Sequence, residues 1–266
     1  MHRLLPVAAL VVFAAAMWAL HREIEHFNFS DFRAYLHQIS LEQLGVAACS
    51  TIVGYLALIC YDWFALRYVR QKVANWQIAL TAFIGYAFSM NIGHSVISGG
   101  AVRMRLYTSW GIDAADVTRV IGFNFVIGIL GQILAGGLLF SLTEFSIPAS
   151  LEFPFHSVRG LGIFLLFVVA AFLVLISLRR EAIQVRNWRF ELPTFRLTLP
   201  AIMVSSVDWL LSGVVLFALM PPDMGLTLWY FLGIVSLAQA IALLSLVPGG
   251  LGVFETIILH LLPESV

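Results

Sequence analysis

Runs of apolar residues, each about as long as a membrane is thick, follow one another along most of the chain. About 20 apolar residues in a helix cross roughly 30 Å of hydrocarbon, so each such run predicts a membrane-embedded helix. A shorter apolar run, 251–262, comes near the end of the chain. We therefore expect an all-α polytopic membrane protein. The full-length candidate runs are 4–20, 44–64, 78–97, 120–142, 161–178, 198–220 and 228–247.

The composition agrees with this pattern. Of the 266 residues, 61% are hydrophobic and only 11% are charged, which is too few to cover a water-soluble surface. The 15 basic and 15 acidic residues cancel, which argues against nucleic acid as a partner. Cys49 and Cys60 lie in one predicted helix, about 16 Å apart along its axis. Neither a disulfide nor a metal site between them is expected.

The basic residues predict how the runs cross the membrane, because loops on the cytoplasmic side collect Lys and Arg. The loops 65–77 and 179–197 are both basic, so we expect both, and the N-terminus, on the cytoplasmic side of a bacterial inner membrane. Three crossings between them would place them on opposite sides. We therefore expect 78–110 to enter from the cytoplasm as a re-entrant hairpin that turns at Ser98-Gly99-Gly100.

A second glycine break lies at Pro248-Gly249-Gly250, and it predicts a second hairpin. The two Gly-Gly pairs are 150 residues apart, and the pairs Asp62-Trp63 and Asp208-Trp209 are 146 residues apart. These offsets predict two inverted repeats, an arrangement common among transporters. Chance recurrence of the two dipeptides is the alternative.

The expected fold is thus a single transmembrane domain, 1–266, with about six transmembrane helices and two re-entrant helical hairpins. The first repeat would cover about 44–142. The second would cover about 198–266 and would be incomplete, because it lacks a counterpart of the run 120–142.

Hairpins that break inside a membrane offer sites for anions, because a helix N-terminus carries unpaired N–H groups and a partial positive charge. Ser98 would be an N-cap, and the glycines would let a phosphate approach the backbone. Arg103 and Arg105 would point into a central wet cavity and bind that phosphate through their guanidinium groups. The alternative is that both arginines only anchor the segment among lipid headgroups.

Acidic residues inside apolar runs are costly and therefore candidates for function. Asp62 lies near the end of its run, and we interpret it as interfacial. Asp208 and Glu255 need a partner, a cavity or a proton, or they contact a cationic group of the substrate. Under the 150-residue offset Glu255 corresponds to Arg105, so these two residues could form an ion pair. Five polar residues line the cavity or make interhelical hydrogen bonds: Asn91, His94, Asn124, Gln132 and Gln239.

Enzymatic chemistry is not expected. The sequence contains none of the patterns GxSxG, GxxxxGK[ST], HExxH and CxxC, and its histidines are scattered without ligand spacing. We therefore expect no catalytic residues, no metal and no cofactor.

Two segments together resemble a known family. The segment Ser98-Gly99-Gly100-Ala101-Val102-Arg103-Met104-Arg105-Leu106-Tyr107, followed by Trp110-Gly111, resembles the S-G-x-x-x-R-x-R-L-Y…W-G segment of the bacterial multiple peptide resistance factors. The segment Val247-Pro248-Gly249-Gly250-Leu251-Gly252-Val253-Phe254-Glu255 is similar to the family's V-P-G-G-L-G-x-F-E segment. The resemblance covers nearly the whole chain.

The resemblance implies the N-terminal flippase module of these lysylphosphatidylglycerol synthase/flippases. Such a module moves aminoacylated phosphatidylglycerol, for example lysylphosphatidylglycerol, from the inner to the outer leaflet. The outer surface then repels cationic antimicrobial peptides. Read together, the residue arguments and the two motifs give these candidate substrate-binding residues: Ser98, Gly99, Gly100, Arg103, Arg105, Tyr107, Asp208, Pro248, Gly249, Gly250, Gly252 and Glu255.

The chain departs from the family in lacking the aminoacyltransferase domain and the last span, so we expect a fragment or a shortened relative. The expected partners are the bilayer and a phospholipid such as aminoacyl-phosphatidylglycerol, with no nucleic acid. A second copy of the chain, a separate synthase domain and the missing span remain open as further partners. Two alternatives to a flippase also remain open: a non-transporting scaffold for a lipid synthase, and a carrier of another anionic lipid or a small anion.

Overall fold

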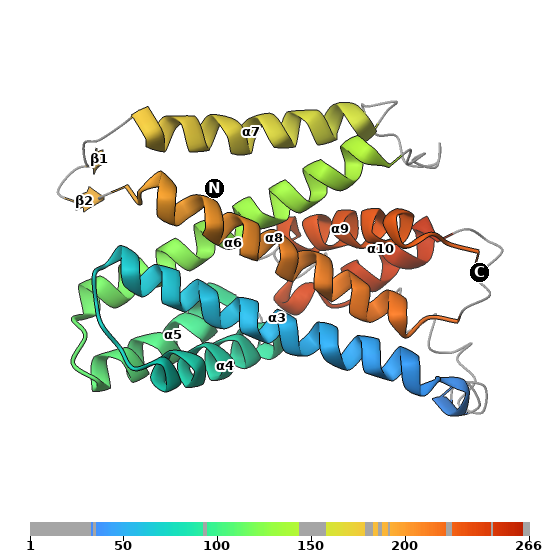
Figure 1. Ribbon diagram of the computed structural model, residues 1–266, viewed down its shortest axis with the longest axis horizontal. Coiled ribbons are helices and arrows are strands. Elements are labelled where there is room, and N and C mark those ends of the chain that lie inside the picture. Colours follow the sequence, from blue (N-terminus) through green and yellow to red (C-terminus); the bar gives the residue numbers. More distant parts are fainter. Residues whose placement is uncertain are drawn as a thin grey trace.

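The computed structural model describes residues 33, 36–92, 95–143, 158–178, 183–185, 188–190, 192–221, 225–245 and 247–262. Its helices are α3 (Leu41–Tyr68), α4 (Asn75–Ile92), α5 (Ser95–Ser109), α6 (Ala114–Leu142), α7 (Val158–Leu178), α8 (Phe195–Ala218), α9 (Leu228–Leu244) and α10 (Val253–Leu261), as Figure 1 shows. A short 3-10 turn, η2 (Pro248–Gly250), precedes α10, and two strands, β1 (Ile183–Val185) and β2 (Trp188–Phe190), pair antiparallel before α8.

Four of these helices, α3, α6, α7 and α8, are long and apolar enough to cross a membrane. They coincide with four of the predicted crossing runs, which confirms a polytopic all-α membrane protein. The predicted run 4–20 lies outside the described residues. The run 228–247 does not supply a further span, because α9 has only 17 residues and packs against α10 as one arm of a hairpin. The expected total of about six crossing helices is therefore not reached in the described part of the chain.

The helix starts follow from local capping. At the start of α3 the Ser40 hydroxyl accepts a hydrogen bond from Gln43 N at 3.1 Å, and the Gln43 side chain accepts one from Ser40 N at 2.9 Å. This reciprocal pair satisfies two N–H groups that the helix itself leaves unpaired. At the start of α6, the Asp113 carboxylate accepts a hydrogen bond from Ala115 N at 3.1 Å. Side-chain caps thus fix where α3 and α6 begin.

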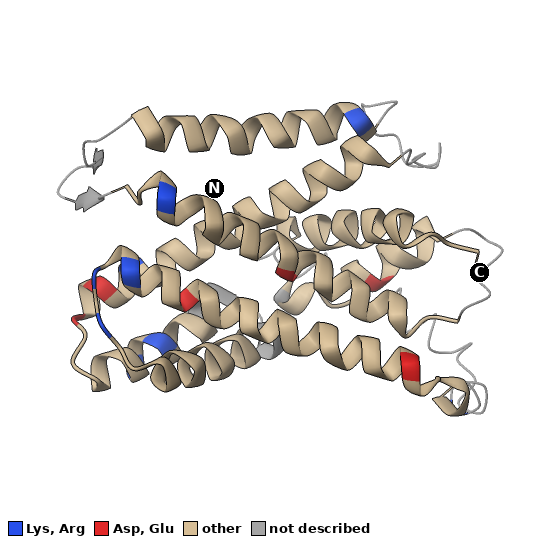
Figure 2. Cartoon of the chain, viewed as in Figure 1, with Lys and Arg blue, Asp and Glu red and all other residues tan. Residues whose placement is uncertain are grey.

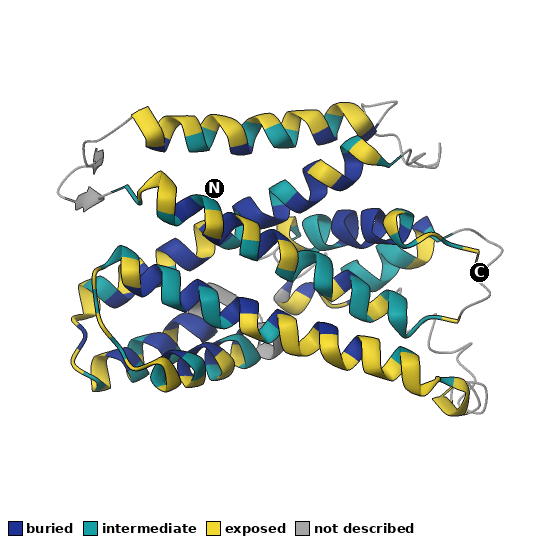
Figure 3. Ribbon diagram, viewed as in Figure 1, coloured by how far each residue is buried: buried dark blue, intermediate teal, exposed yellow. Residues whose placement is uncertain are grey.

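Helix α6 is the centre of the bundle. It contacts α3, α5, α7, α8 and α9, and half of its most apolar window is buried, against 17% for α7 and 22% for α3. By contrast, α7 and the first half of α3 consist mostly of exposed residues, as Figure 3 shows. In a membrane these exposed apolar side chains face lipid, so their exposure carries no penalty.

Glycines let the helices around α6 approach closely. A Cβ added at Gly162 of α7 would lie 2.5 Å from Ser141 N and 2.9 Å from Gly137 O, both backbone atoms of α6. A Cβ at Gly131 of α6 would lie 2.0 Å from Ser205 Oγ of α8. Small residues at helix crossings are the usual means of packing in a membrane, where no hydrophobic force drives helices together.

The first hairpin forms as expected, but its turn is elsewhere. Helix α4 ends at Ile92, α5 begins at Ser95 and the two helices pack against each other, so Ser98, Gly99 and Gly100 all lie inside α5. Ser98 is therefore not an N-cap. Gly99 serves the packing of the two arms, because a Cβ there would lie 2.8 Å from Gly85 O and 2.0 Å from Ser89 Oγ on α4. The prediction of a turn at the glycines is wrong because a helix accepts glycine where another backbone lies too close for a side chain.

At the second hairpin the glycines do make the turn. Gly249, Gly250 and Gly252 have φ angles of 66°, 65° and 76°, in the left-handed region that glycine adopts at little cost. A Cβ at Gly250 would also lie 2.8 Å from Ala242 Cβ of α9. The break predicted at Pro248-Gly249-Gly250 is thus confirmed.

The two hairpins lie at opposite ends of the bundle and meet between them. In Figure 1, α4 and α5 lie beside the end of α3, whereas α9 and α10 lie beside the end of α8. Helix α4 contacts η2 where the two hairpins approach each other. Figure 2 shows Lys and Arg gathered at the end where α3 ends and α8 begins. The end of α3 and the start of α8, which border the two basic loops, therefore lie at the same end of the bundle, as expected if the run 78–97 does not cross.

The close contact between α6 and α7 predicts a specific sensitivity to substitution. Gly162→Ala should lower the free energy of unfolding by about 1–3 kcal/mol, because its new methyl group would meet backbone atoms that cannot rotate away. The thermal loss of the monodisperse peak of the detergent-solubilised protein measures this effect. Gly160→Ala is the matched control on the same helix, since nothing lies within 4 Å of its added Cβ. Equal stability of the two variants would contradict the packing argument.

Candidate functional site

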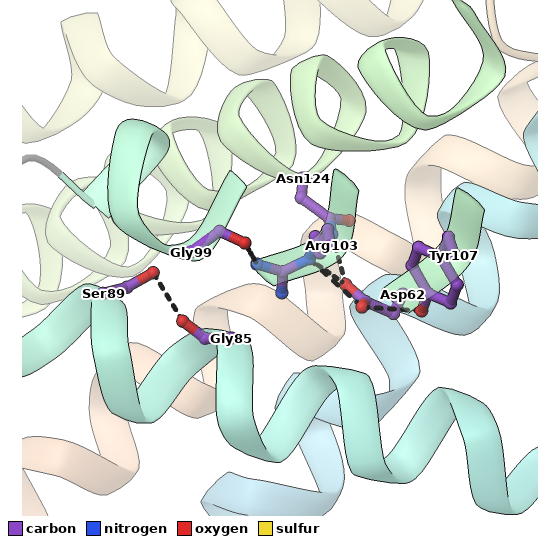
Figure 4. Close-up of polar contacts among 7 residues, drawn as sticks. All are labelled: Asp62, Gly85, Ser89, Gly99, Arg103, Tyr107 and Asn124. Carbon is purple, nitrogen blue, oxygen red and sulfur yellow. Dashed lines mark hydrogen bonds and ion pairs between the residues drawn. The ribbon is translucent and has the colours of Figure 1, made fainter. Parts of the chain in front are cut away.

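A buried carboxylate is the centre of the site. Asp62 on α3 is 0% exposed, and side chains from α5 and α6 surround it, as Figure 4 shows. Tyr107 OH donates a hydrogen bond to Asp62 Oδ2 at 2.8 Å, and Asn124 Nδ2 donates to Asp62 Oδ1. The interpretation of Asp62 as interfacial is therefore wrong.

Arg103 on α5 supplies the charge that Asp62 needs. Its Nε lies 2.9 Å from Asp62 Oδ1 and 3.1 Å from Oδ2, and the residue is 4% exposed. Its Nη1 donates a hydrogen bond to Gly99 O at 3.3 Å, and its Cζ lies 4.5 Å from the ring centroid of Tyr86 on α4. Among the described residues, Nη2 has no hydrogen-bond acceptor. One edge of the guanidinium thus neutralises Asp62 and one nitrogen is left over for another acceptor.

Glycines make room for this guanidinium. A Cβ added at Gly85 of α4 would lie 3.0 Å from Arg103 Nη1, and one at Gly99 of α5 would lie 3.2 Å from the same atom. Gly99, Arg103 and Tyr107 follow each other at intervals of four residues, so they share one face of α5. The R-x-x-x-Y spacing therefore brings both donors to Asp62, and the glycine one turn earlier opens the space beside them.

A second acidic residue connects to this cluster through tyrosines. Asp208, on α8, accepts a hydrogen bond from Tyr61 OH at 3.1 Å. Tyr61 is the neighbour of Asp62 on α3, and its ring packs edge-on against Tyr86 with centroids 5.9 Å apart. Tyr86 in turn covers Arg103. A continuous line of polar side chains thus runs from α8 to the first hairpin.

The second hairpin uses its acidic residue locally. Glu255 Oε2 accepts a hydrogen bond from Gly252 N at 2.7 Å, so the carboxylate caps the N-terminus of α10. The positive end of that helix is therefore occupied by a side chain of the protein itself. Arg105 is exposed on α5, beside Met104, Thr108 and Ser109 in a shallow surface depression. The predicted ion pair between Arg105 and Glu255 is absent among the described contacts, and Asp62 is the residue that pairs with an arginine of α5.

Between the described side chains of α6, α8 and α9, the expected central wet cavity is not open. The gap between α6, α8 and α9, beside Gln132 and Gln239, leaves no volume for a water-sized molecule. Gln132 Nε2 donates to Ser236 O at 3.0 Å, and Gln239 Nε2 donates to Ser212 Oγ at 2.7 Å. Together with Asn124, they confirm the interpretation of these polar residues as interhelical hydrogen-bonding groups. The side chains of Asn91 and His94 lie outside the described part of the structure.

Within the described ranges, no three His, Cys, Asp or Glu side chains lie close enough to share a metal ion. The site instead contains a buried positive charge, the guanidinium of Arg103. A guanidinium held between two arms of a hairpin, with one nitrogen unused by the described residues, can bind an anion when the arms move.

The sequence names Asp62 and Asn124 but does not place them beside Arg103 and Tyr107. Asp62 lies six positions before the end of α3, so the sequence favours an interfacial position for it, and Asn124 is expected to line a cavity or to make an interhelical hydrogen bond. Only the position of α5 shows that Asp62 is covered. The cost of an acid in an apolar run marks Asp62 as a candidate, and the arginine in the neighbouring hairpin is the signal for its partner.

The buried ion pair predicts a large loss of stability when one partner is removed. Asp62→Ala would leave a buried guanidinium without its counter-charge, and should cost about 3–5 kcal/mol. Thermal unfolding in detergent measures the effect. The double variant Asp62→Leu/Arg103→Met removes both charges and should be more stable than Asp62→Ala.

The control is Asp116→Ala, which breaks the 3.0 Å pair with Arg119, whose side chain is 48% exposed. A pair that exposed should be worth less than about 1 kcal/mol. Equal losses for Asp62→Ala and Asp116→Ala would mean that the buried pair does not hold the helices together.

Comparison with known proteins places this arrangement among bacterial membrane proteins. No family model matches the chain. The uncharacterised protein slr0712 of Synechocystis is 31% identical over 251 residues, which are 94% of this chain and 78% of that protein. The inner membrane protein YbhN of Escherichia coli is 27% identical over 212 residues, 79% of this chain and 66% of YbhN.

A third relative is much longer. Phosphatidylglycerol lysyltransferase of Staphylococcus aureus is 25% identical over 255 residues, which cover 94% of this chain and 28% of that protein. The chain therefore belongs to the same family as slr0712, and it is similar over most of its length to YbhN and to part of phosphatidylglycerol lysyltransferase.

Proposed function

We propose that this protein moves a phospholipid between the two leaflets of a bacterial inner membrane. The substrate would be aminoacylated phosphatidylglycerol, such as lysylphosphatidylglycerol, carried from the inner to the outer leaflet. Removal of negative charge from the outer surface would then give resistance to cationic antimicrobial peptides. The single observation that carries the proposal is the match of nearly the whole chain to part of a phosphatidylglycerol lysyltransferase.

The arrangement of the hairpins supports this proposal. Two helical hairpins from opposite ends of the bundle contact each other through α4 and η2. Each hairpin therefore extends only part of the way along the bundle, so a headgroup that displaces one hairpin has a shorter path to the other side. We propose that the segments of about 44–142 and 198–266 are the two inverted repeats of one transport domain.

The chemistry of the first hairpin supports a headgroup that contains a phosphate. Arg103 is the buried guanidinium of the hairpin, and its Nη2 is unused by the described residues. A guanidinium binds a phosphate through two parallel hydrogen bonds, so Arg103 would hold the phosphodiester once the hairpin separates from α3. Arg105, exposed on another face of α5, would attract the headgroup before it enters.

The remaining candidate residues would shape and close the path of the headgroup. Gly99 and Gly100 would keep the arms close enough to shield the headgroup, and Tyr107 would hold Asp62 in place until the hairpin separates from α3. In the second hairpin, Pro248, Gly249, Gly250 and Gly252 would form the turn that closes the path, with Glu255 securing the helix behind it. The basic end of the bundle would face the cytoplasm, together with the N-terminus.

The two arginines should differ in a transport assay. In liposomes carrying the purified protein, exchange of labelled lysylphosphatidylglycerol and of plain phosphatidylglycerol should be faster than in protein-free liposomes. Arg103→Lys keeps the charge beside Asp62 but loses the planar fork, and should slow exchange roughly tenfold, the equivalent of one charge-assisted hydrogen bond. Arg105→Ala should raise the lipid concentration needed for half-maximal rate and leave the maximal rate near that of the wild type.

Arg119→Lys is the matched control, because Arg119 is an exposed residue of α6 outside both hairpins. Faster exchange of the aminoacylated lipid than of plain phosphatidylglycerol would support the named substrate. Absence of exchange by folded wild-type protein would count against a flippase and favour a scaffold that stabilises a lipid synthase.

A further inference from the structure

Asp208 is a carboxyl group in the middle of a membrane-spanning helix. It lies 13 residues after the start of α8 and 10 before its end, about 20 Å and 15 Å along the axis. It is partly buried against α3, with Gly54 next to its Oδ1. Such a group in the interior of a membrane is costly unless a cation, a set of donors or a proton compensates it.

The charges around Asp208 differ from those around Asp62. Asp62 has an arginine and two further donors, whereas the hydrogen bond to Asp208 among the described side chains comes from Tyr61, a neutral group. In the helices that pack against α8, the sequence offers no cation at this depth. Helix α6 has none after Arg119, α7 has none after Arg159, α9 has none at all, and the basic residue of α3 is Arg67, near its end. In α8 itself the basic residue is Arg196, which lies in the first turn of the helix.

The facing titratable groups can be named completely for the described elements. From α3 they are Tyr61, which bonds to Asp208, and Asp62, which is paired with Arg103; from α4 it is Tyr86, one ring further away. Helices α6, α7 and α9 present no titratable side chain at this depth, since Tyr230 lies in the first turn of α9. A proton is therefore the cation available to Asp208 within the described structure.

Asp208 is also connected to the anion site proposed above. Tyr61 links it to Tyr86 through an edge-on ring contact of 5.9 Å, and Tyr86 covers the Arg103 guanidinium at 4.5 Å. A carboxylate accepts the Tyr61 hydrogen bond, whereas a neutral carboxyl can donate one instead. A change in the proton on Asp208 thus alters the hydrogen bond of Tyr61, and Tyr61 packs on the ring that holds Arg103.

The connection between Asp208 and Arg103 matters for the total charge inside the membrane. Asp62 and Arg103 cancel, so a lipid phosphate that binds Arg103 adds one negative charge inside the membrane. One proton on Asp208 removes one negative charge from the same region. We propose that Asp208 binds the proton that accompanies the lipid phosphate across the membrane, so that the proton balances the negative charge of the phosphate; this inference rests on the lipid transport proposed above.

The proton step needs no other reactant. A proton from the water on one side binds a carboxylate oxygen of Asp208 while the phosphate binds Arg103. When the headgroup leaves on the other side, the Asp208 carboxyl releases the same proton there, and Tyr61 donates its hydrogen bond to the carboxylate again.

A pH difference across liposomes carrying the protein tests this coupling. Valinomycin with equal potassium on both sides holds the electrical potential at zero, and the distribution of labelled plain phosphatidylglycerol between the leaflets is measured at steady state. One pH unit is a tenfold ratio of proton activity, so one proton per lipid should concentrate the lipid up to about tenfold in the leaflet facing the more alkaline side. Asp208→Asn cannot release a proton and should give a ratio near one, whereas Asp208→Glu should keep the accumulation.

Glu42→Gln is the matched control, because it removes a carboxylate from the exposed first turn of α3 and should accumulate lipid as the wild type does. Accumulation by Asp208→Asn equal to that of the wild type would overturn the inference. So would a wild type that exchanges lipid but never accumulates it, although the flippase proposal would then stand.

A second measurement does not depend on transport. The infrared difference spectrum between acidic and alkaline pH, recorded on protein in lipid nanodiscs, should contain a protonated-carboxyl band that Asp208→Asn removes and Glu42→Gln does not. A band unchanged in Asp208→Asn would overturn the proton site. Absence of lipid exchange by the wild type would instead refute the transport function, and the infrared band would still report whether Asp208 binds a proton.

Discussion

A carboxylate inside a membrane protein needs a positive charge and hydrogen-bond donors beside it, and the first hairpin exists in its observed position because it brings both to Asp62. Arg103 and Tyr107 come from α5, Asn124 comes from α6, and Asp62 comes from α3. One charged group therefore fixes three helices relative to each other. The glycines follow from the same requirement, because the guanidinium fits between α4 and α5 only where Gly85 and Gly99 have no side chains.

The two halves of the chain share a pattern of residues but use it differently. Asp62 is neutralised by an arginine, whereas Asp208 receives a hydrogen bond from a tyrosine. Trp63 stacks under Arg67 at 3.9 Å, whereas Trp209 donates a hydrogen bond to Gly128 O at 2.9 Å. The same dipeptide thus serves charge neutralisation in one half and helix packing in the other. This asymmetry is what a carrier needs if one half holds an anion and the other holds its compensating charge.

The sequence predicted the long helices, the two hairpins and the common end of the basic loops, because apolar length and charge distribution are properties of each segment alone. It did not predict the turn of the first hairpin, since Gly99 and Gly100 look the same in a turn and at a close helix contact. Nor did it predict the partner of Arg103, because Asp62 is 41 residues away in the sequence and the contact depends on how α5 packs against α3. The capping role of Glu255 could have been predicted from the sequence, because an acidic residue three positions after a helix-starting glycine is a local capping signal.

The contact between α4 and α5 is too tight to slide, because Gly99 packs directly on the backbone of Gly85 and on Ser89. These two arms must therefore move as one rigid body. The carboxylate that holds Arg103 belongs to α3, outside that body. The Arg103–Asp62 ion pair thus joins this rigid hairpin to α3, so a displacement of the hairpin from α3 would have to break a charged contact as well as apolar packing.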